Sequence, residues 1–239
     1  MNITDLSNLY RSQQYLQSTS ATQTDPVQKA FASAAARLNK EQQTTSVQVS
    51  AVGQVKAGFA RVEDAGKALA STQPTTTTAD IKKGLQALVS AYNDARSAAT
   101  SATTDSGRTR TAANDLRRAV ATDSSRTDLR SLGITQQQDG SLTLDSKVLD
   151  KALQSNPDSV RTSAARIGSQ LQQTASRALS DSGSVGATLN TLNARAQNIE
   201  ARLAEQQNLA TASQQTVQQR SASASSFLGI NSYQNIFSL

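Results

Sequence analysis

The side chains that could do chemistry in this sequence are carboxylates, because the chain contains neither histidine nor cysteine. Two pairs of acids lie close enough in the sequence to act together: Glu63 with Asp64, and Asp123 with Asp128. A carboxyl group works as a general acid near neutral pH only when its surroundings raise its pKa. We expect these acids to lie exposed on helix faces or at helix caps. The sequence therefore predicts no catalytic residue and a protein that is not an enzyme.

Metal and cofactor sites are not indicated either. Histidine and cysteine, the commonest ligands of zinc in proteins, are absent. The glycines at positions 53, 58, 66 and 84 fall inside helical patterns and do not follow the order of a phosphate-binding loop. We therefore expect no metal and no cofactor.

The composition favours long helices over a thick globular core. Hydrophobic residues make up 36% of the 239 residues and aromatic residues only 3%, without tryptophan. The net charge of +6 comes from scattered Lys and Arg residues, without the basic run and interleaved aromatic residues on which single-stranded nucleic acid stacks. No stretch approaches the roughly 18 consecutive apolar residues of a membrane helix. We expect neither nucleic acid nor a membrane as a partner, and export without a cleaved hydrophobic signal.

The elements that position these residues begin with one long helix. Residues 1–26 are polar, and we expect them to be disordered alone or ordered by assembly. Pro26 suits the first turn of a helix, with Asp25 as its cap. Across residues 27–70 a heptad pattern predicts a long stem helix, and its middle positions Glu41, Thr45 and Gln48 are polar.

The rest of the chain divides at breaks in this pattern. Pro74 and a run of threonines predict a linker at residues 71–78. A small α/β domain follows at residues 79–180. Two short alternating runs flank Asp139-Gly140 and predict a β-hairpin at residues 132–144. Asp145 should cap the next helix, with Val148, Leu149 and Leu153 facing inward.

The last long helix is predicted at residues 188–226, after a loop, and a docking tail at residues 227–239. The two long helices can pair antiparallel, which brings both chain ends together. The fold class is therefore mainly α: long antiparallel coiled helices that form a stem, with a small α/β piece containing a β-hairpin. We predict a helix-packing or subunit interface at Phe31, Leu38, Val52, Val55, Phe59, Val62, Leu189, Leu192, Ile199 and Leu203. Apolar residues gathered near the end predict C-terminal docking through Phe227, Leu228, Ile230, Tyr233, Ile236 and Phe237.

One segment carries a specific resemblance. Residues 132–161 contain Leu-Gly-Ile, Asp-Gly-Ser-Leu, Leu-Asp and Asn-Pro-Asp-Ser-Val in that order. This string resembles the C-terminal domain of flagellar hook-associated protein 2, the filament cap (FliD). Ala-Tyr-Asn at residues 91–93 and the helical segments at 42–69 and 189–206 are similar to the same family more weakly.

The resemblance carries expectations about function. It implies a secreted structural protein of the bacterial flagellum, exported by the flagellar type III apparatus. It also implies self-assembly as a homo-oligomer, contact with flagellin or other flagellar axial proteins, and a cytoplasmic export chaperone.

Two departures from the family pattern limit these expectations. Family members carry large head domains between the first long helix and the Ala-Tyr-Asn helix, where this chain has only residues 71–78. The family's N-terminal Gly-Leu-Ala-Ser-Gly-Leu-Asp type motif is also missing. We therefore expect a shortened, headless relative. The alternative is a secreted helical binding protein or effector that is not part of the filament.

Overall fold

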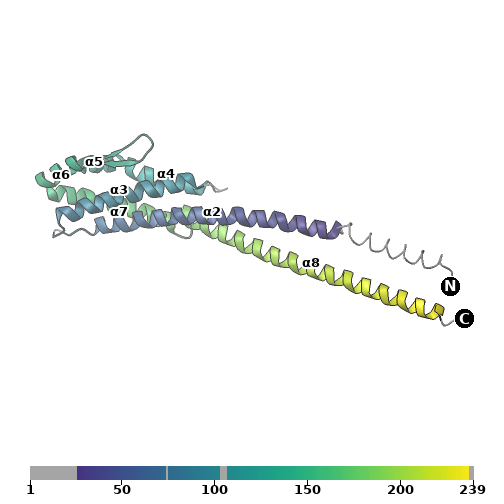
Figure 1. Cartoon of the computed structure of the whole chain (residues 1–239). Coiled ribbons are helices and arrows are strands. Elements are labelled where there is room, and N and C mark those ends of the chain that lie inside the picture. Colours follow the sequence, from purple (N-terminus) through teal and green to yellow (C-terminus); the bar gives the residue numbers. More distant parts are fainter. Residues whose placement is uncertain (1–25, 74, 103–106, 237–239) are drawn as a thin grey trace. The chain divides into compact units, whose positions relative to one another are not determined.

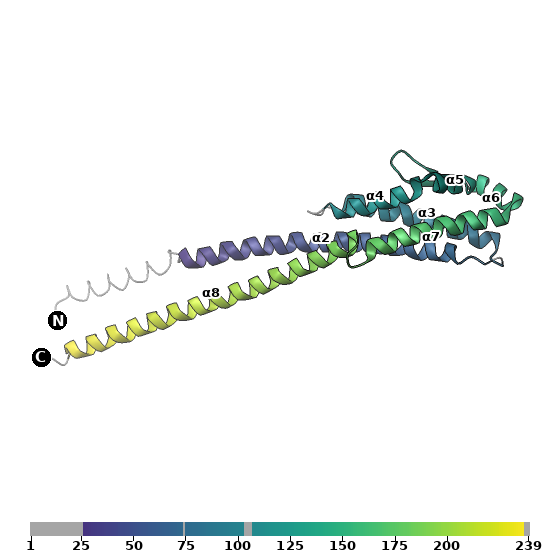
Figure 2. The same ribbon diagram turned by 180° about the vertical axis from the view of Figure 1, so that it is seen from behind.

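The computed structural model describes residues 26–73, 75–102 and 107–236, and side chains from residue 28 to 220 and at 223 within these ranges. Its elements, in chain order, are α2 (Pro26–Ala70), α3 (Thr78–Ser101), α4 (Arg108–Ala121), α5 (Asp123–Ser131), β1 (Ile134–Gln136), β2 (Leu142–Leu144), α6 (Ser146–Ser155), α7 (Pro157–Leu179) and α8 (Ser184–Ile236) (Figure 1, Figure 2). The predicted fold class is confirmed: the described chain is mainly helical with one small antiparallel hairpin.

The chain folds as two compact units. The first unit combines Met1–Gln43 with Gln197–Leu239, and the second is Thr44–Ala196. The division falls inside both α2 and α8, so each long helix belongs to two units. In α2 it lies within the polar stretch of the heptad pattern, between Glu41 and Thr45.

The second unit has a helical core built around the later part of α2. The heptad side chains Val52, Val55, Phe59 and Val62 are all fully buried there. They belong to one cluster with the buried face of α3, whose largest member is Tyr92. Burying a side chain of this size stabilises a fold by about 1.5–3 kcal/mol. The core of this unit therefore combines large aliphatic side chains with alanines.

Small residues let the helices of this unit approach closely. A Cβ atom placed on Gly66 of α2 would lie 2.5 Å from the carbonyl oxygen of Gly168 in α7. A Cβ atom on Gly58 would lie 2.8 Å from the Cα atom of Ala95 in α3. Real Cβ atoms do not approach backbone atoms this closely, so both crossings require glycine.

The hairpin is anchored to α3 by two neighbouring side chains. The amide of Asn93 donates from Nδ2 to the Leu142 carbonyl and accepts at Oδ1 from the Leu142 N–H, both at 2.8 Å. The buried Tyr92 hydroxyl donates to the carbonyl of Gly140 at 3.1 Å. Gly140 has φ +82°, a conformation that glycine adopts without strain. The Ala-Tyr-Asn sequence and the Asp-Gly turn thus form one structural feature.

The strands of the hairpin pair in antiparallel register, with Ile134 opposite Leu144 and Gln136 opposite Leu142. Ile134 and Leu142 are buried, whereas Thr135 and Thr143 between them are exposed. This alternation is typical of a ribbon that covers a core with one face.

Of the two predicted helix caps, only Asp145 lies within the described residues, and it is confirmed. The Asp145 carboxylate caps α6 by accepting from the N–H groups of Lys147 and Val148. The cap of α7 is Asn156, which accepts from the Ser159 N–H at 3.0 Å. Asp25, the predicted cap of the first helix, lies outside the described residues.

One local prediction is wrong, and two helices differ from what the sequence pattern indicated. Val148 does not face inward: it is 43% exposed. The helix α5 was not foreseen, because its nine residues hold a single large apolar side chain, Leu129. The last helix begins at Ser184, before the predicted start at residue 188, and its backbone continues as helix through Ile236.

A pair of glycine substitutions tests the crossing of α2 and α7. Gly66→Ala should lower the midpoint of thermal unfolding, because overpacking costs about 1–3 kcal/mol. Gly53→Ala in the same helix meets nothing within 4 Å. It should raise the midpoint, since alanine stabilises a helix interior by about 0.5–1 kcal/mol relative to glycine. Circular dichroism at increasing temperature measures both, and equal shifts for the two variants would contradict the crossing.

Tyr92 gives a prediction on pH dependence. Burial raises the pKa of its phenol above the ordinary value of 10.0, although the nearby Arg96 opposes this shift. A raised pKa means that the contribution of Tyr92 to stability is complete below pH 10 and is lost as the pH rises through the folded-state pKa. Tyr92→Phe should therefore unfold more readily at neutral pH, and its free energy of unfolding should fall less steeply above pH 10. Urea unfolding of both proteins at several alkaline pH values measures the difference, and parallel curves would refute it.

Candidate functional site

The first unit contains a groove between its two helical segments. The beginning of α2 and the later part of α8 run antiparallel in this unit (Figure 1, Figure 2). The groove has a volume of about 360 Å³. It is lined by Gln28, Phe31, Ala32, Ala35 and Asn39 from α2, and by Leu203, Gln206, Gln207, Ala210, Ser213 and Gln214 from α8. We refer to these eleven residues as the terminal groove.

The terminal groove exposes apolar surface that two helices cannot cover by themselves. Each helix contributes one large apolar side chain, Phe31 or Leu203, and both are only half-buried. The alanines beside them are too small to close the space. Further along the same face of α8, Val217 is 50% exposed. The seam is therefore open on one side.

Gln206 places a polar atom in this seam. The oxygen of its side-chain amide is buried and has no hydrogen-bond partner in the described part of the chain. An unsatisfied buried acceptor costs about 1–3 kcal/mol. Gln206 therefore weakens the pairing of the two segments at the position where a heptad would carry an apolar residue.

The structure separates the predicted interface residues into three groups. Phe31 and Leu203 line the terminal groove. Leu38 and Ile199 are buried in the same unit, with 8% and 2% exposure. The other six pack in the second unit, where Leu189 is partly buried and the rest are buried: Val52, Val55, Phe59, Val62, Leu189 and Leu192.

These six residues already have neighbours within their own unit, so they offer little surface to another molecule. The heptad pattern could not distinguish the groups, because its spacing is continuous along both helices. The predicted docking residues Phe227, Leu228, Ile230, Tyr233 and Ile236 fall on the helical backbone of α8, but their side chains lie outside the described part, and Phe237 lies outside it altogether.

One acid departs from the expected exposure. Asp128 is only 6% exposed. Its Oδ1 atom accepts from the Ser163 hydroxyl at 2.9 Å and lies 3.4 Å from Nη2 of Arg166. Asp123, the other member of the predicted pair, is exposed. Asp128 therefore joins α5 to α7, and the pair does not form a shared site.

Among the described residues we find neither a candidate metal cluster nor a candidate membrane span. They contain no group of three or more His, Cys, Asp or Glu side chains that could hold a metal ion. No helix within residues 26–73, 75–102 and 107–236 is both long and apolar enough to span a lipid bilayer.

Comparison with protein families gives one match. Residues 106–227, about half of the chain, match the model for the C-terminus of flagellar hook-associated protein 2. The match includes residues 132–161, on which the resemblance rests, and α8 as far as residue 227. The weaker similarities at residues 42–69 and 91–93 lie outside it and stay predictions. Comparisons with curated proteins and with solved structures found no match.

A single substitution tests the energetic cost of the unsatisfied Gln206 oxygen in the terminal groove. Gln206→Leu replaces the unsatisfied oxygen with apolar atoms and should strengthen the pairing of the two segments by about 1 kcal/mol. Hydrogen exchange of the amides in residues 197–220 should become slower. Gln215→Leu, at an exposed position outside the groove, is the matched control. Equally slowed exchange in both variants would show that added hydrophobicity, and not removal of the unsatisfied oxygen, stabilises the pairing.

Proposed function

The chain belongs to the flagellar hook-associated protein 2 family, and we propose that it is a headless cap-type protein that joins the flagellar filament through its paired terminal segments. Proteins of this family are structural parts of the flagellum. The observation that carries the proposal is the terminal groove, where apolar side chains of both helices remain half-exposed. A neighbouring subunit that lays a helix along this groove would cover them.

The energetics of the first unit support assembly of this kind. Phe31 and Leu203 are half-buried in the single chain, so a helix that completes their burial gains part of the roughly 1.5–3 kcal/mol that a full burial provides. A contact that exists only in the assembled state stabilises only that state. The partners in this proposal are flagellin or other flagellar axial proteins, and further copies of this chain as a homo-oligomer.

Export through the flagellar type III apparatus is the second part of the proposal. An exported chain must unfold before it passes a narrow channel, and a weak seam makes unfolding easier. Thr45 and Gln206 both carry a buried side-chain oxygen without a hydrogen-bond partner among the described residues. In this proposal a cytoplasmic chaperone protects the apolar C-terminal residues from Phe227 to Phe237 before export, and the protein is secreted to the flagellum.

The lack of head domains limits the role. The helix α2 ends at Ala70 and α3 begins at Thr78, so the connection has only seven residues. The carbonyl of Leu69 accepts from the Thr72 hydroxyl at 2.9 Å, and Thr77 caps α3 by accepting from the Asp80 N–H at 3.1 Å. A connection of this length has no room for an inserted domain. We therefore propose a protein that keeps the stem and the hairpin domain and acts as an accessory or minor axial component.

The experiment compares two leucines of α8. Leu203 lines the terminal groove, whereas Leu209 is 51% exposed and does not. Leu203→Gln should lower co-sedimentation with purified filaments by about tenfold or more, since a central apolar contact contributes at least about 1–2 kcal/mol. Leu209→Gln should leave it unchanged. Immunogold electron microscopy of the wild-type protein would then locate it on the filament.

Two outcomes would contradict the proposal. Equal binding by both variants would remove the terminal groove from the interface. A wild-type protein that is found only free in the medium, and never with filaments, would instead favour a secreted helical binding protein or effector.

A further inference from the structure

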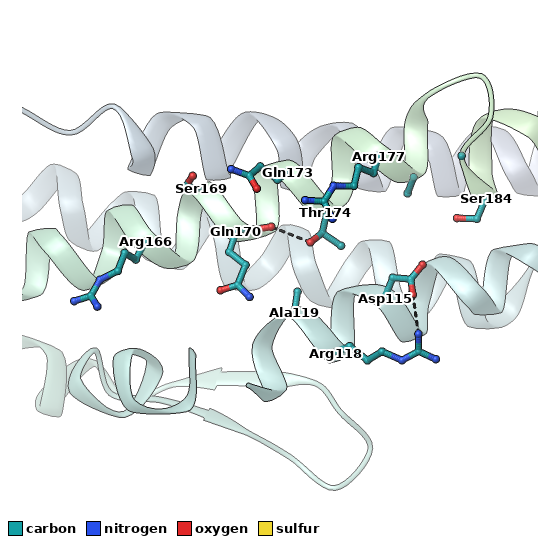
Figure 3. Close-up of a pocket in the computed structure, with 12 residues that line it drawn as sticks. Asp115, Arg118, Ala119, Arg166, Ser169, Gln170, Gln173, Thr174, Arg177 and Ser184 are labelled. Carbon is teal, nitrogen blue, oxygen red and sulfur yellow. Dashed lines mark hydrogen bonds and ion pairs between the residues drawn. The ribbon is translucent and has the colours of Figure 1, made fainter. Parts of the chain in front are cut away.

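A second and larger groove lies in the second unit, between α4, α7 and the start of α8. It has a volume of about 820 Å³. Its α7 wall is a continuous polar face, with side chains at the spacing that places them on one side of a helix: Arg166, Ser169, Gln170, Gln173, Thr174 and Arg177. In Figure 3, Arg166 and Arg177 lie toward opposite ends of this face. We call the whole groove between α4, α7 and the start of α8 the arginine groove.

The α4 wall adds a third guanidinium group. Arg118 and Asp115 lie in the arginine groove and form an ion pair at 3.3 Å, in which both side chains are more than one-third exposed (Figure 3). Exposed ion pairs contribute about 0–1 kcal/mol, so an incoming anion can replace Asp115 at little cost. The lining of the arginine groove therefore holds three cationic groups and one carboxylate.

The two arginines of α7 are also available to a ligand. The side chain of Arg177 forms no ion pair within the described part of the chain. Arg166 lies near the buried Asp128, yet its side chain stays 61% exposed. A guanidinium group has five N–H donors, so Arg166 can keep the contact with Asp128 and still bind a second carboxylate.

The spacing of the arginines selects the shape of the ligand. Arg166 and Arg177 are eleven residues apart on one helix face, which corresponds to about 16 Å. A compact anion such as phosphate spans only a small part of this distance. A chain that carries carboxylates at intervals can span it, and arginine pairs with carboxylates through two parallel hydrogen bonds.

The neutral residues of the arginine groove indicate the chemical class of its ligand. Ser169 and Gln173 offer donors and acceptors that match the N–H and C=O groups of a peptide backbone. The Thr174 hydroxyl already donates to the Gln170 carbonyl at 2.9 Å, so it can only accept from a backbone N–H (Figure 3). The arginine groove has no aromatic ring on which a nucleic-acid base could stack. We propose that the arginine groove binds an acidic polypeptide segment of a partner protein, at a site separate from the terminal groove.

The test measures binding of a defined acidic peptide to the full chain. The probe is a fluorescein-labelled peptide of about twelve glutamates, which when extended exceeds the distance between the arginines. Fluorescence anisotropy at about 0.15 M salt, where distant charges are screened, reports its affinity. The triple variant R118Q/R166Q/R177Q should bind at least about tenfold more weakly than the wild-type protein.

Two further variants keep the test decisive. R61Q/K83Q/K151Q removes the same charge from exposed positions outside the arginine groove, and it should bind like the wild-type protein. R118Q/R177Q leaves Arg166 beside Asp128, so it separates a loss of binding from a loss of folding, and it should still weaken binding severalfold.

Three outcomes would overturn the proposal. An equal loss in R61Q/K83Q/K151Q would mean that net charge alone attracts the peptide. Competition by inorganic phosphate at the same concentration as the peptide would identify a site for a compact anion. Tighter binding of an oligomer of uronic acid than of the glutamate peptide would assign the arginine groove to an acidic polysaccharide.

Discussion

Close approach of helix backbones is the constraint on which the second unit depends. With aromatic residues at 3% of the sequence, large side chains cannot fill wide spaces between helices. The helices must approach until small residues touch, as Gly66 does with Gly168 and Gly58 with Ala95. Dispersion contacts between small groups at these crossings then add to those of the buried aliphatic side chains. Such packing tolerates little added volume, so the positions of these glycines fix how α2 lies against α3 and α7.

This constraint explains why the hairpin needs polar anchors. The strands β1 and β2 have three residues each and bury mainly Ile134 and Leu142. Two-stranded hairpins of this size are marginally stable in water by themselves. Asn93 pairs with both backbone groups of Leu142 as a third strand would, and Tyr92 holds the turn at Gly140. The anchors on α3 therefore stabilise a ribbon that has too few apolar residues of its own.

The sequence predicted which side of each long helix faces inward, because the heptad period alone decides it. Val52, Phe59 and Ile199 are buried accordingly. It did not predict which neighbour covers each position, since the pattern is the same in both units. The sequence also did not predict the terminal groove or the arginine groove. Each groove combines residues from separate helices, and only packing brings these helices together. Asp128 is buried only because α7 brings Ser163 and Arg166 to it.

The first unit differs from the second in how completely its heptad side chains are buried. Along α8 in this unit, burial falls from Ile199, which is 2% exposed, through half-buried Leu203 and Gln206 to Val217, which is 50% exposed. The same heptad spacing continues throughout, so the direction of the seam is kept while its hydrophobic content declines. A seam with preserved geometry and incomplete burial is poorly stabilised within one chain, yet it is already aligned for another helix. The heptad seam of α8 therefore keeps its direction although its pairing within one chain is weak. An assembly surface requires both properties when its partner binds after the chain has folded.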